Sequence, residues 1–120
     1  MNNKLIENLL TILNQLKFYH WGANSYAQHK ALGDAYDQLN IIIDDFVEIL
    51  LGKDGKELSP ISINIRTESE LNINDALNEI SEYLSNDILS FLNENDTDLL
   101  NLRDEILSII NKTKYLLKLT

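Results

Sequence analysis

Apolar residues recur at intervals of three and four along most of this 120-residue chain, and that period predicts helices. In the first predicted helix the apolar stripe is Leu5, Leu9, Ile12, Leu13, Leu16 and His20. A one-sided stripe is typical of a helix that packs against a shared core. We therefore predict a single all-α domain, residues 1–120, with helices at about residues 4–21, 25–51, 68–93 and 97–118.

Glycines and capping residues set the predicted helix ends. Gly22 to Ser25 separates the first two helices, and Gly52 ends the second. The run Thr67-Glu68-Ser69-Glu70 has the form of a capping box and predicts the start of the third helix. One of the residues 95–97 is expected to cap the fourth.

The connection at about residues 53–66 is long, and its isoleucines at 61, 63 and 65 alternate with polar residues. Alternation is the period of an extended segment with one buried face. Fourteen extended residues reach about 46 Å, and the helices are roughly 36–40 Å long. The sequence therefore predicts a ferritin-like four-helix bundle with a long crossover between helices 2 and 3. A flexible loop in an up-down-up-down bundle is the alternative.

Charge and composition narrow the class of function. The chain has 19 acidic and 10 basic residues, a net charge of −9 and no cysteine. A surface this acidic repels phosphate backbones, so we expect no nucleic-acid partner. No segment approaches the roughly 18 apolar residues of a membrane span, and the first residues lack the pattern of a signal peptide. We expect a cytoplasmic protein without a membrane partner.

His20 and His29 are the only histidines and both lie on apolar stripes. Neutral imidazole is a common metal ligand. The alternative is a pair of core residues that form hydrogen bonds with backbone carbonyls.

The second helix carries what we call the acidic face. At 100° per residue its members share one side of the helix, away from the main stripe; they are Asp37, Ile41, Asp44, Glu48 and Leu51. Asp44 and Glu48 are four residues apart, so their side chains can converge on one cation. Carboxylates with imidazole favour iron, manganese or zinc, and carboxylates alone would hold magnesium or calcium. The alternative is a charged surface with two incidental apolar residues.

The first half of the chain resembles the Dps-type mini-ferritins. The residues that carry the resemblance are Phe18-Tyr19-His20-Trp21, His29, Tyr36, Asp44-Asp45-Phe46-Val47-Glu48 and Gly52. The resemblance implies a metal site at a dimer interface, with His20 and His29 of one chain facing Asp44 and Glu48 of another. Asp37 is a further candidate ligand. It also implies iron or manganese, a homodimer or higher homo-oligomer, and possible ferroxidase-like activity. Where the family usually has a carboxylate, this chain has Gly33.

A second resemblance covers most of the chain. His20-Trp21 with residues 25–33, and residues 96–107, are similar to a short uncharacterised family common in tailed phages and large DNA viruses. That likeness leaves an alternative function open: a non-enzymatic helical protein that binds a host or virion protein and no metal. Within the second segment, Arg103-Asp104-Glu105 could form a buried ion pair or a polar face.

Overall fold

The computed structural model of the protein describes residues 2–55 and 57–119. The α-helices are α1 (Asn2–Trp21), α2 (Tyr26–Asp54), α3 (Ile73–Ser85) and α4 (Thr97–Leu117), and a 3-10 helix, η1 (Asp87–Phe91), follows α3. No strand occurs in the described part of the chain. The prediction of an all-α chain with four helices is therefore confirmed.

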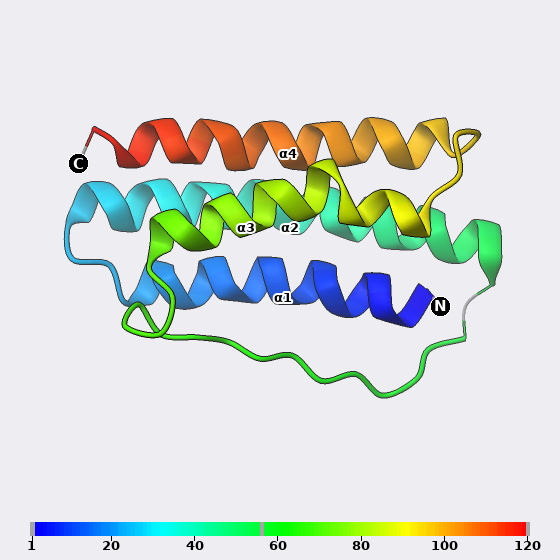
Figure 1. Ribbon diagram of the computed structural model, residues 1–120, viewed down its shortest axis with the longest axis horizontal. Helices are drawn as coiled ribbons and strands as arrows, with labels where there is room; N and C mark the ends of the chain where they lie inside the picture. The colour runs from blue at the N-terminus through cyan, green and yellow to red at the C-terminus, as the bar shows by residue number, and fades with distance from the viewer. Residues whose placement is uncertain (1, 56, 120) are drawn as a thin grey trace.

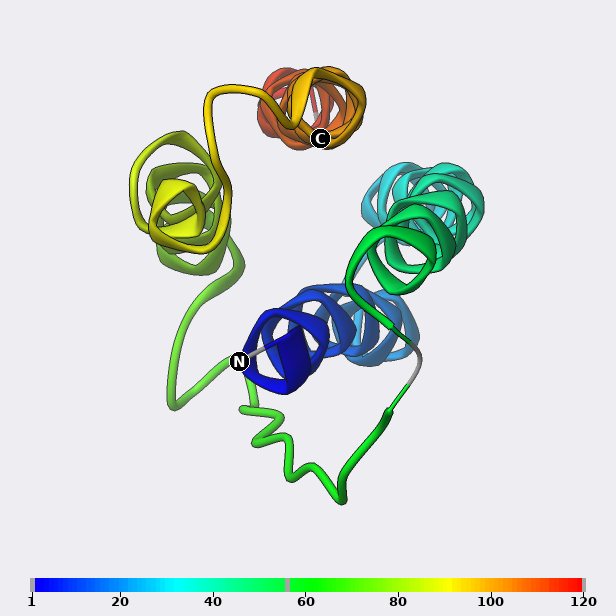
Figure 2. The same ribbon diagram turned by 90° about the vertical axis from the view of Figure 1, so that its right-hand side faces the viewer.

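The four α-helices lie along the longest dimension of the molecule (Figure 1). Viewed from the end, they surround a common centre, with α2 between α1 and α4 and with α3 beside α4 (Figure 2). α1 and α2 run in opposite directions, as do α3 and α4, whereas α2 and α3 run in the same direction (Figure 1). This arrangement is compatible with a four-helix bundle.

The apolar stripes of all four helices meet in one core. Side chains such as Leu9, Phe46 and Ile106 have no exposed surface. Burial of each contributes about 1.5–3 kcal/mol relative to an exposed position. His20, which belongs to the predicted stripe of the first helix, is only half-buried and lies at the edge of this core.

The third helix begins at Ile73, later than the predicted start at 68. The predicted capping box closes a separate turn, in which the Glu70 carboxylate accepts the backbone N–H and the hydroxyl of Thr67. Asn72 is the N-cap of α3, because its side chain accepts the backbone N–H of Asp75. The predicted start of the third helix is therefore wrong, because Asn72 and not the run 67–70 caps α3.

The third helix also ends earlier than the predicted residue 93, because α3 stops at Ser85 and continues only as η1. Arg103 of α4 donates a guanidinium hydrogen bond of 2.9 Å to the carbonyl of Leu84. In an uninterrupted α-helix that carbonyl would accept the N–H of residue 88. Ile88 is nevertheless fully buried, so the apolar stripe stays on the core side across the break. This hydrogen bond from Arg103 therefore caps the C-terminal end of α3. The Arg103 guanidinium also donates to the exposed carboxylate of Asp104.

Residues 57–71, which we call the strap, connect α2 to α3 and follow α1 along its length (Figure 1). Side chains of α1 form hydrogen bonds with backbone groups of the strap at intervals over the whole helix. The contacts are Asn3 with Ser59 and Pro60, Glu7 with Ser62, Gln15 with Arg66, and Tyr19 with Leu71. Ile61 and Ile65 are half-buried, whereas Ile63 is 40% exposed. The side of the strap that carries these isoleucines is therefore only partly buried.

Candidate functional site

The two histidines come together where α1 turns into α2. His20 lies in the last turn of α1, and His29 lies in the first turn of α2. The start of α2 is fixed by Ser25, whose hydroxyl accepts the backbone N–H of Gln28 at 3.1 Å. The turn is short, so the end of one helix and the beginning of the next hold the two side chains side by side.

The imidazole rings of His20 and His29 are stacked, with centroids 3.8 Å apart and an angle of 22° between planes. Nδ1 of His20 lies 2.7 Å from the carbonyl oxygen of His29, and Nδ1 of His29 lies 2.9 Å from the carbonyl oxygen of His20. A carbonyl can only accept, so each Nδ1 must carry the hydrogen. We call this reciprocal arrangement the imidazole clasp. In the neutral rings, the nitrogen left with a free lone pair is Nε2.

Gly33 makes room for the imidazole clasp. A Cβ atom at this position would lie 2.7 Å from Cε1 and 2.9 Å from Nδ1 of His20. Those distances are shorter than side-chain carbon contacts allow, so any other residue would displace the ring. The glycine at position 33 therefore has a physical reason, which is the space that the His20 ring occupies. A carboxylate side chain here would compete with His20 for the same space.

The acidic face of α2 is open to solvent. Asp37, Asp44 and Glu48 are all exposed, and Ile41 between them is 66% exposed. The nearby Asp44 carboxylate raises the pKa of Glu48 above its ordinary value, first through a shared hydrogen bond and then through charge repulsion. Their four-residue spacing places the two carboxylates on the same side of α2.

The imidazole clasp and the acidic pair do not meet within one chain. His29 and Asp44 are fifteen residues apart on the same helix, which places them about 22 Å apart at 1.5 Å per residue. Among the described residues of one chain, no three His, Cys, Asp or Glu side chains are grouped so that they could hold a metal ion. The donor types fit iron or manganese, but a site built from all of them requires a second chain.

Two exposed aromatic residues, Trp21 and Tyr26, lie in and after the last turn of α1, next to the imidazole clasp in the sequence. Trp21 is 69% exposed and Tyr26 is 77% exposed, and the Tyr26 ring lies 6.2 Å from that of His29. The Lys17 ammonium lies 4.5 Å from the centre of the Tyr36 ring and 5.6 Å from that of Trp21. Cation–π attraction between Lys17 and Tyr36 therefore links α1 to α2.

Gly33 is noted from the sequence only as the position of a missing carboxylate, and Lys17 is not identified from it. For Gly33 a signal existed, because an isolated glycine inside a helical pattern usually has a packing reason. For Lys17 no comparable signal existed, since its aromatic partners are recognisable only after α1 and α2 are packed.

Comparison with known proteins identifies one family. The model of a family of unknown function, DUF5856, matches residues 20–117, which is most of the chain and includes both histidines and the acidic face. No curated protein and no solved structure matches the chain. Within residues 2–55 and 57–119, none of the helices has the length and hydropathy needed to cross a membrane.

Proposed function

The chain belongs to the DUF5856 family of unknown function, and for it we propose a small ferritin-like protein that binds iron or manganese between two copies of the chain. The proposed ligands are His20 and His29 of one copy and Asp44 and Glu48 of the other, with Asp37 as a further carboxylate. A two-fold axis between two α2 helices would create two equivalent sites, since a symmetric interface uses the same surface twice.

The observation that carries this proposal is the geometry of the imidazole clasp. Histidines that ligate a metal usually donate their other ring N–H to a backbone carbonyl or a carboxylate, which fixes the ring and its tautomer. Both His20 and His29 have such a bond at Nδ1. In each neutral ring Nε2 is therefore the nitrogen that is left to act as a ligand.

The acidic face supplies the second half of the proposed site. Asp44 and Glu48 repel each other, as the raised pKa of Glu48 indicates, and a divalent cation would relieve that repulsion. Ile41 is exposed in the middle of the acidic face, and burial of its apolar surface would favour the interface. Imidazole together with carboxylate is a donor set that suits iron and manganese.

The ferritin-like part of the proposal rests on the path of the chain. The strap follows α1 from Asn3 to Tyr19, and α2 and α3 run in the same direction (Figure 1). One long connection of this kind between the second and third helices distinguishes ferritin-like bundles from up-down-up-down bundles. A cytoplasmic location belongs to the same proposal and is supported by the absence of cysteine.

The test is to add Mn²⁺ to the metal-free protein and to measure both its mass in solution and its melting temperature. We expect a dimer in the presence of Mn²⁺, with a melting temperature that rises with metal concentration because the metal binds only the folded state. Glu48→Gln should lose both effects. Asp45→Asn is the matched control, since Asp45 is an exposed neighbour outside the proposed ligand set, and it should retain both.

Mixing two defective chains distinguishes a shared site from a site within one chain. His29→Ala and Glu48→Gln chains should each fail to bind Mn²⁺ alone. In the mixed dimer, one of the two sites has both intact histidines and intact carboxylates, so half of the wild-type binding should return. A monomer without bound metal by elemental analysis, in the presence of either Mn²⁺ or Fe²⁺, would exclude the proposed function.

A second candidate is a non-enzymatic protein that binds a host or virion protein. The carbonyl-bonded histidines and the exposed Trp21 and Tyr26 support it, because a structural clasp beside exposed aromatic rings needs no metal. Aromatic residues of this kind are enriched at protein interfaces. Under this candidate, replacing Trp21 would weaken partner binding and metal would have no effect on stability.

A further inference from the structure

From Pro60 onward, the backbone of the strap is bonded to α1 through alternate residues. The carbonyl of Pro60 accepts a hydrogen bond from the first turn of α1. The N–H of Ser62 donates to the Glu7 carboxylate at 3.1 Å. The N–H and the carbonyl of Arg66 both bond the side-chain amide of Gln15, at 2.9 Å each. The backbone groups that face α1 therefore belong to even-numbered residues of the strap.

The spacing of these contacts indicates an extended backbone. Glu7 and Gln15 are eight residues apart on α1, which is about 12 Å at 1.5 Å per residue. Their strap partners, Ser62 and Arg66, are four residues apart, which is about 13 Å at 3.3 Å per residue. Residues 57–67 contain no helix and no turn. The strap therefore follows α1 here in the conformation of a β-strand.

Three isoleucines between these contacts have their backbone groups on the opposite side. Successive residues of an extended chain direct their N–H and C=O groups to opposite sides, so those of Ile61, Ile63 and Ile65 point away from α1. Within residues 2–55 and 57–119, none of these groups forms a hydrogen bond. We call them the free edge. They recur at every second residue, as along the unpaired edge of a β-sheet.

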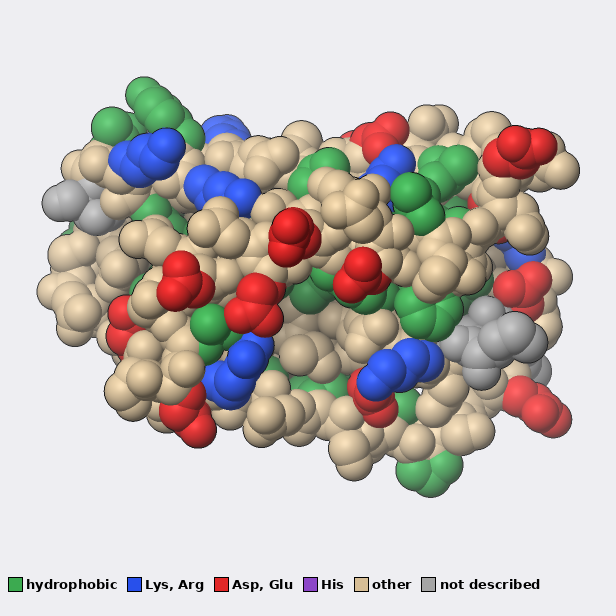
Figure 3. Space-filling model, in the orientation of Figure 1, with side chains coloured by type: hydrophobic (Ala, Val, Ile, Leu, Met, Phe, Trp, Pro, Cys, Tyr) green, Lys and Arg blue, Asp and Glu red, His purple; other side chains and the backbone are tan. Residues whose placement is uncertain are grey.

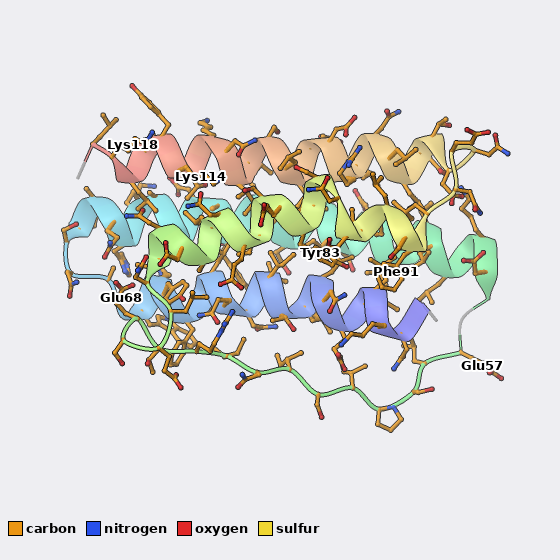
Figure 4. All side chains as sticks on the ribbon, viewed as in Figure 1. Glu57, Glu68, Tyr83, Phe91, Lys114 and Lys118 are labelled. Atoms are coloured by element: carbon orange, nitrogen blue, oxygen red, sulfur yellow. The ribbon has the colours of Figure 1, made fainter. Side chains whose placement is uncertain are left out.

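The free edge lacks the charged side chains that commonly protect the edge of a sheet. Residues 58–65 contain no charged side chain. Carboxylates lie towards the ends of the strap, with Glu57 near one end and Glu68 near the other (Figure 4). Between these ends, the strap side of the molecule shows mainly uncharged side chains (Figure 3, lower margin). Pro60 takes no donor from the free edge, because its position is on the α1 side.

A groove beside the free edge provides space for side chains. Its volume is about 310 Å³, and its lining residues are Asn14, Lys17, Phe18, Trp21, Ile63 and Ile65. Ile63 and Ile65 share one face of the strap, so a strand paired with the free edge would place every second side chain about 5 Å from them. Phe18 is 41% exposed and Trp21 is 69% exposed. Apolar side chains in this position would therefore cover apolar surface, whereas Lys17 would repel a cationic one.

We propose that the free edge binds an extended peptide segment of another protein as an added β-strand. Alternate N–H and C=O groups match an extended backbone, so main-chain hydrogen bonds supply the affinity and the groove selects apolar, β-branched side chains. A second copy of this chain is disfavoured, because each copy carries a net charge of −9. For the same reason the segment has no acidic residues. The free edge contains no proposed metal ligand, so this site is independent of the proposed metal function.

The probe is a seven-residue peptide of alternating valine and threonine with a lysine at each end, titrated into the metal-free full chain in the presence of EDTA. The amide resonances of Ile61, Ile63 and Ile65 should move downfield, and their hydrogens should exchange more slowly with solvent. The amides of Ser62 and Arg66 should change little. An affinity on the order of millimolar is expected for so short a peptide.

Ile63→Pro and Asn64→Pro are matched variants, because each removes one N–H that has no partner among the described residues. Ile63→Pro removes the central donor of the free edge and should weaken peptide binding roughly tenfold. Asn64→Pro removes an N–H on the α1 side and should bind the peptide as wild type does. Ile63→Ala keeps the donor, so it should weaken binding less than Ile63→Pro does. Circular dichroism checks the fold of each variant.

Several results would overturn the proposal. They are the absence of amide shifts up to the solubility limit of the peptide, equal shifts at odd and even residues of the strap, and equal binding by wild type and a folded Ile63→Pro chain. Concentration-dependent shifts of the three isoleucine amides without peptide would identify a second copy of the chain as the occupant, and would also overturn it.

Discussion

The imidazole clasp and the acidic face lie on the same helix, α2, but they are organised by different forces. Where α1 meets α2, each histidine is held by a backbone carbonyl of the neighbouring helix end and by the other ring, and the His20 ring lies over Gly33. Fifteen residues later, Asp44 and Glu48 are positioned only by helical spacing and remain in solvent. The first region is fixed by tertiary packing, and the second by local structure alone.

This difference implies that the two regions respond differently to substitution. A change at the imidazole clasp disturbs packed and hydrogen-bonded atoms, so it should alter the free energy of unfolding of an isolated chain. A change on the acidic face alters mainly charge repulsion, so its principal effect should appear when a cation or a second chain is present.

The largest effect is expected for Gly33→Ala. In an unconstrained helix this change stabilises by about 1 kcal/mol, but here the new methyl group would lie 2.7 Å from the His20 ring. Overpacking costs about 1–3 kcal/mol, so after the helix gain we expect a net loss of up to about 2 kcal/mol in the free energy of unfolding, measured by denaturant titration.

The control for that prediction is the same change in a His20→Ala background. Without the ring, Gly33→Ala should become stabilising by about 1 kcal/mol, the ordinary helix preference. If Gly33→Ala stabilises the chain that still has His20, the imidazole clasp does not occupy the space that the structure assigns to it.

An intermediate effect is expected for His29→Ala. The substitution removes the donor to the His20 carbonyl and one ring of the stack, and a hydrogen bond of this kind contributes about 1 kcal/mol. Denaturant titration should show a loss of that order. Lys30→Ala is the neighbouring control, because its ion pair with Asp34 is exposed and contributes little. Equal losses in the two variants would mean that the stacked pair adds no stability.

The smallest effect, and one of opposite sign, is expected for Asp44→Asn. The pKa of Glu48 is raised by Asp44, so the folded state binds the Glu48 proton more tightly than the unfolded state does. By linkage, this pair disfavours folding above the pKa of Glu48, and the penalty disappears as the pH falls through it. Asp44→Asn should therefore raise the melting temperature slightly at pH 7.

The same comparison at low pH provides the check. Once both carboxyl groups are protonated, wild type and Asp44→Asn should melt at the same temperature. At pH 7, Asp45→Asn should raise the melting temperature by less than Asp44→Asn does, because Asp45 contributes less to the pKa shift of Glu48. A gain that persists in full at low pH would show that charge repulsion between Asp44 and Glu48 is not its cause.

Several features were predictable from local patterns. The periodic leucines and isoleucines predicted four helices, since each stripe required a core to cover it. The four-residue spacing of Asp44 and Glu48 predicted their proximity. The third helix was predicted less well. Its end depends on a hydrogen bond from Arg103 to the carbonyl of Leu84, nineteen residues away. Its start depends on whether residues 67–70 or Asn72 caps the helix.

The amino-acid sequence by itself determined the number of helices, the faces that they bury and the acidic surface, because these follow from spacing along a single helix and from summed charge. Only the tertiary structure decided that His20 stacks on His29 and lies over Gly33, that Gln15 fixes the backbone of Arg66, and that Arg103 ends α3. Each of these depends on side chains meeting backbone groups of another segment, and such meetings exist only after the helices have packed.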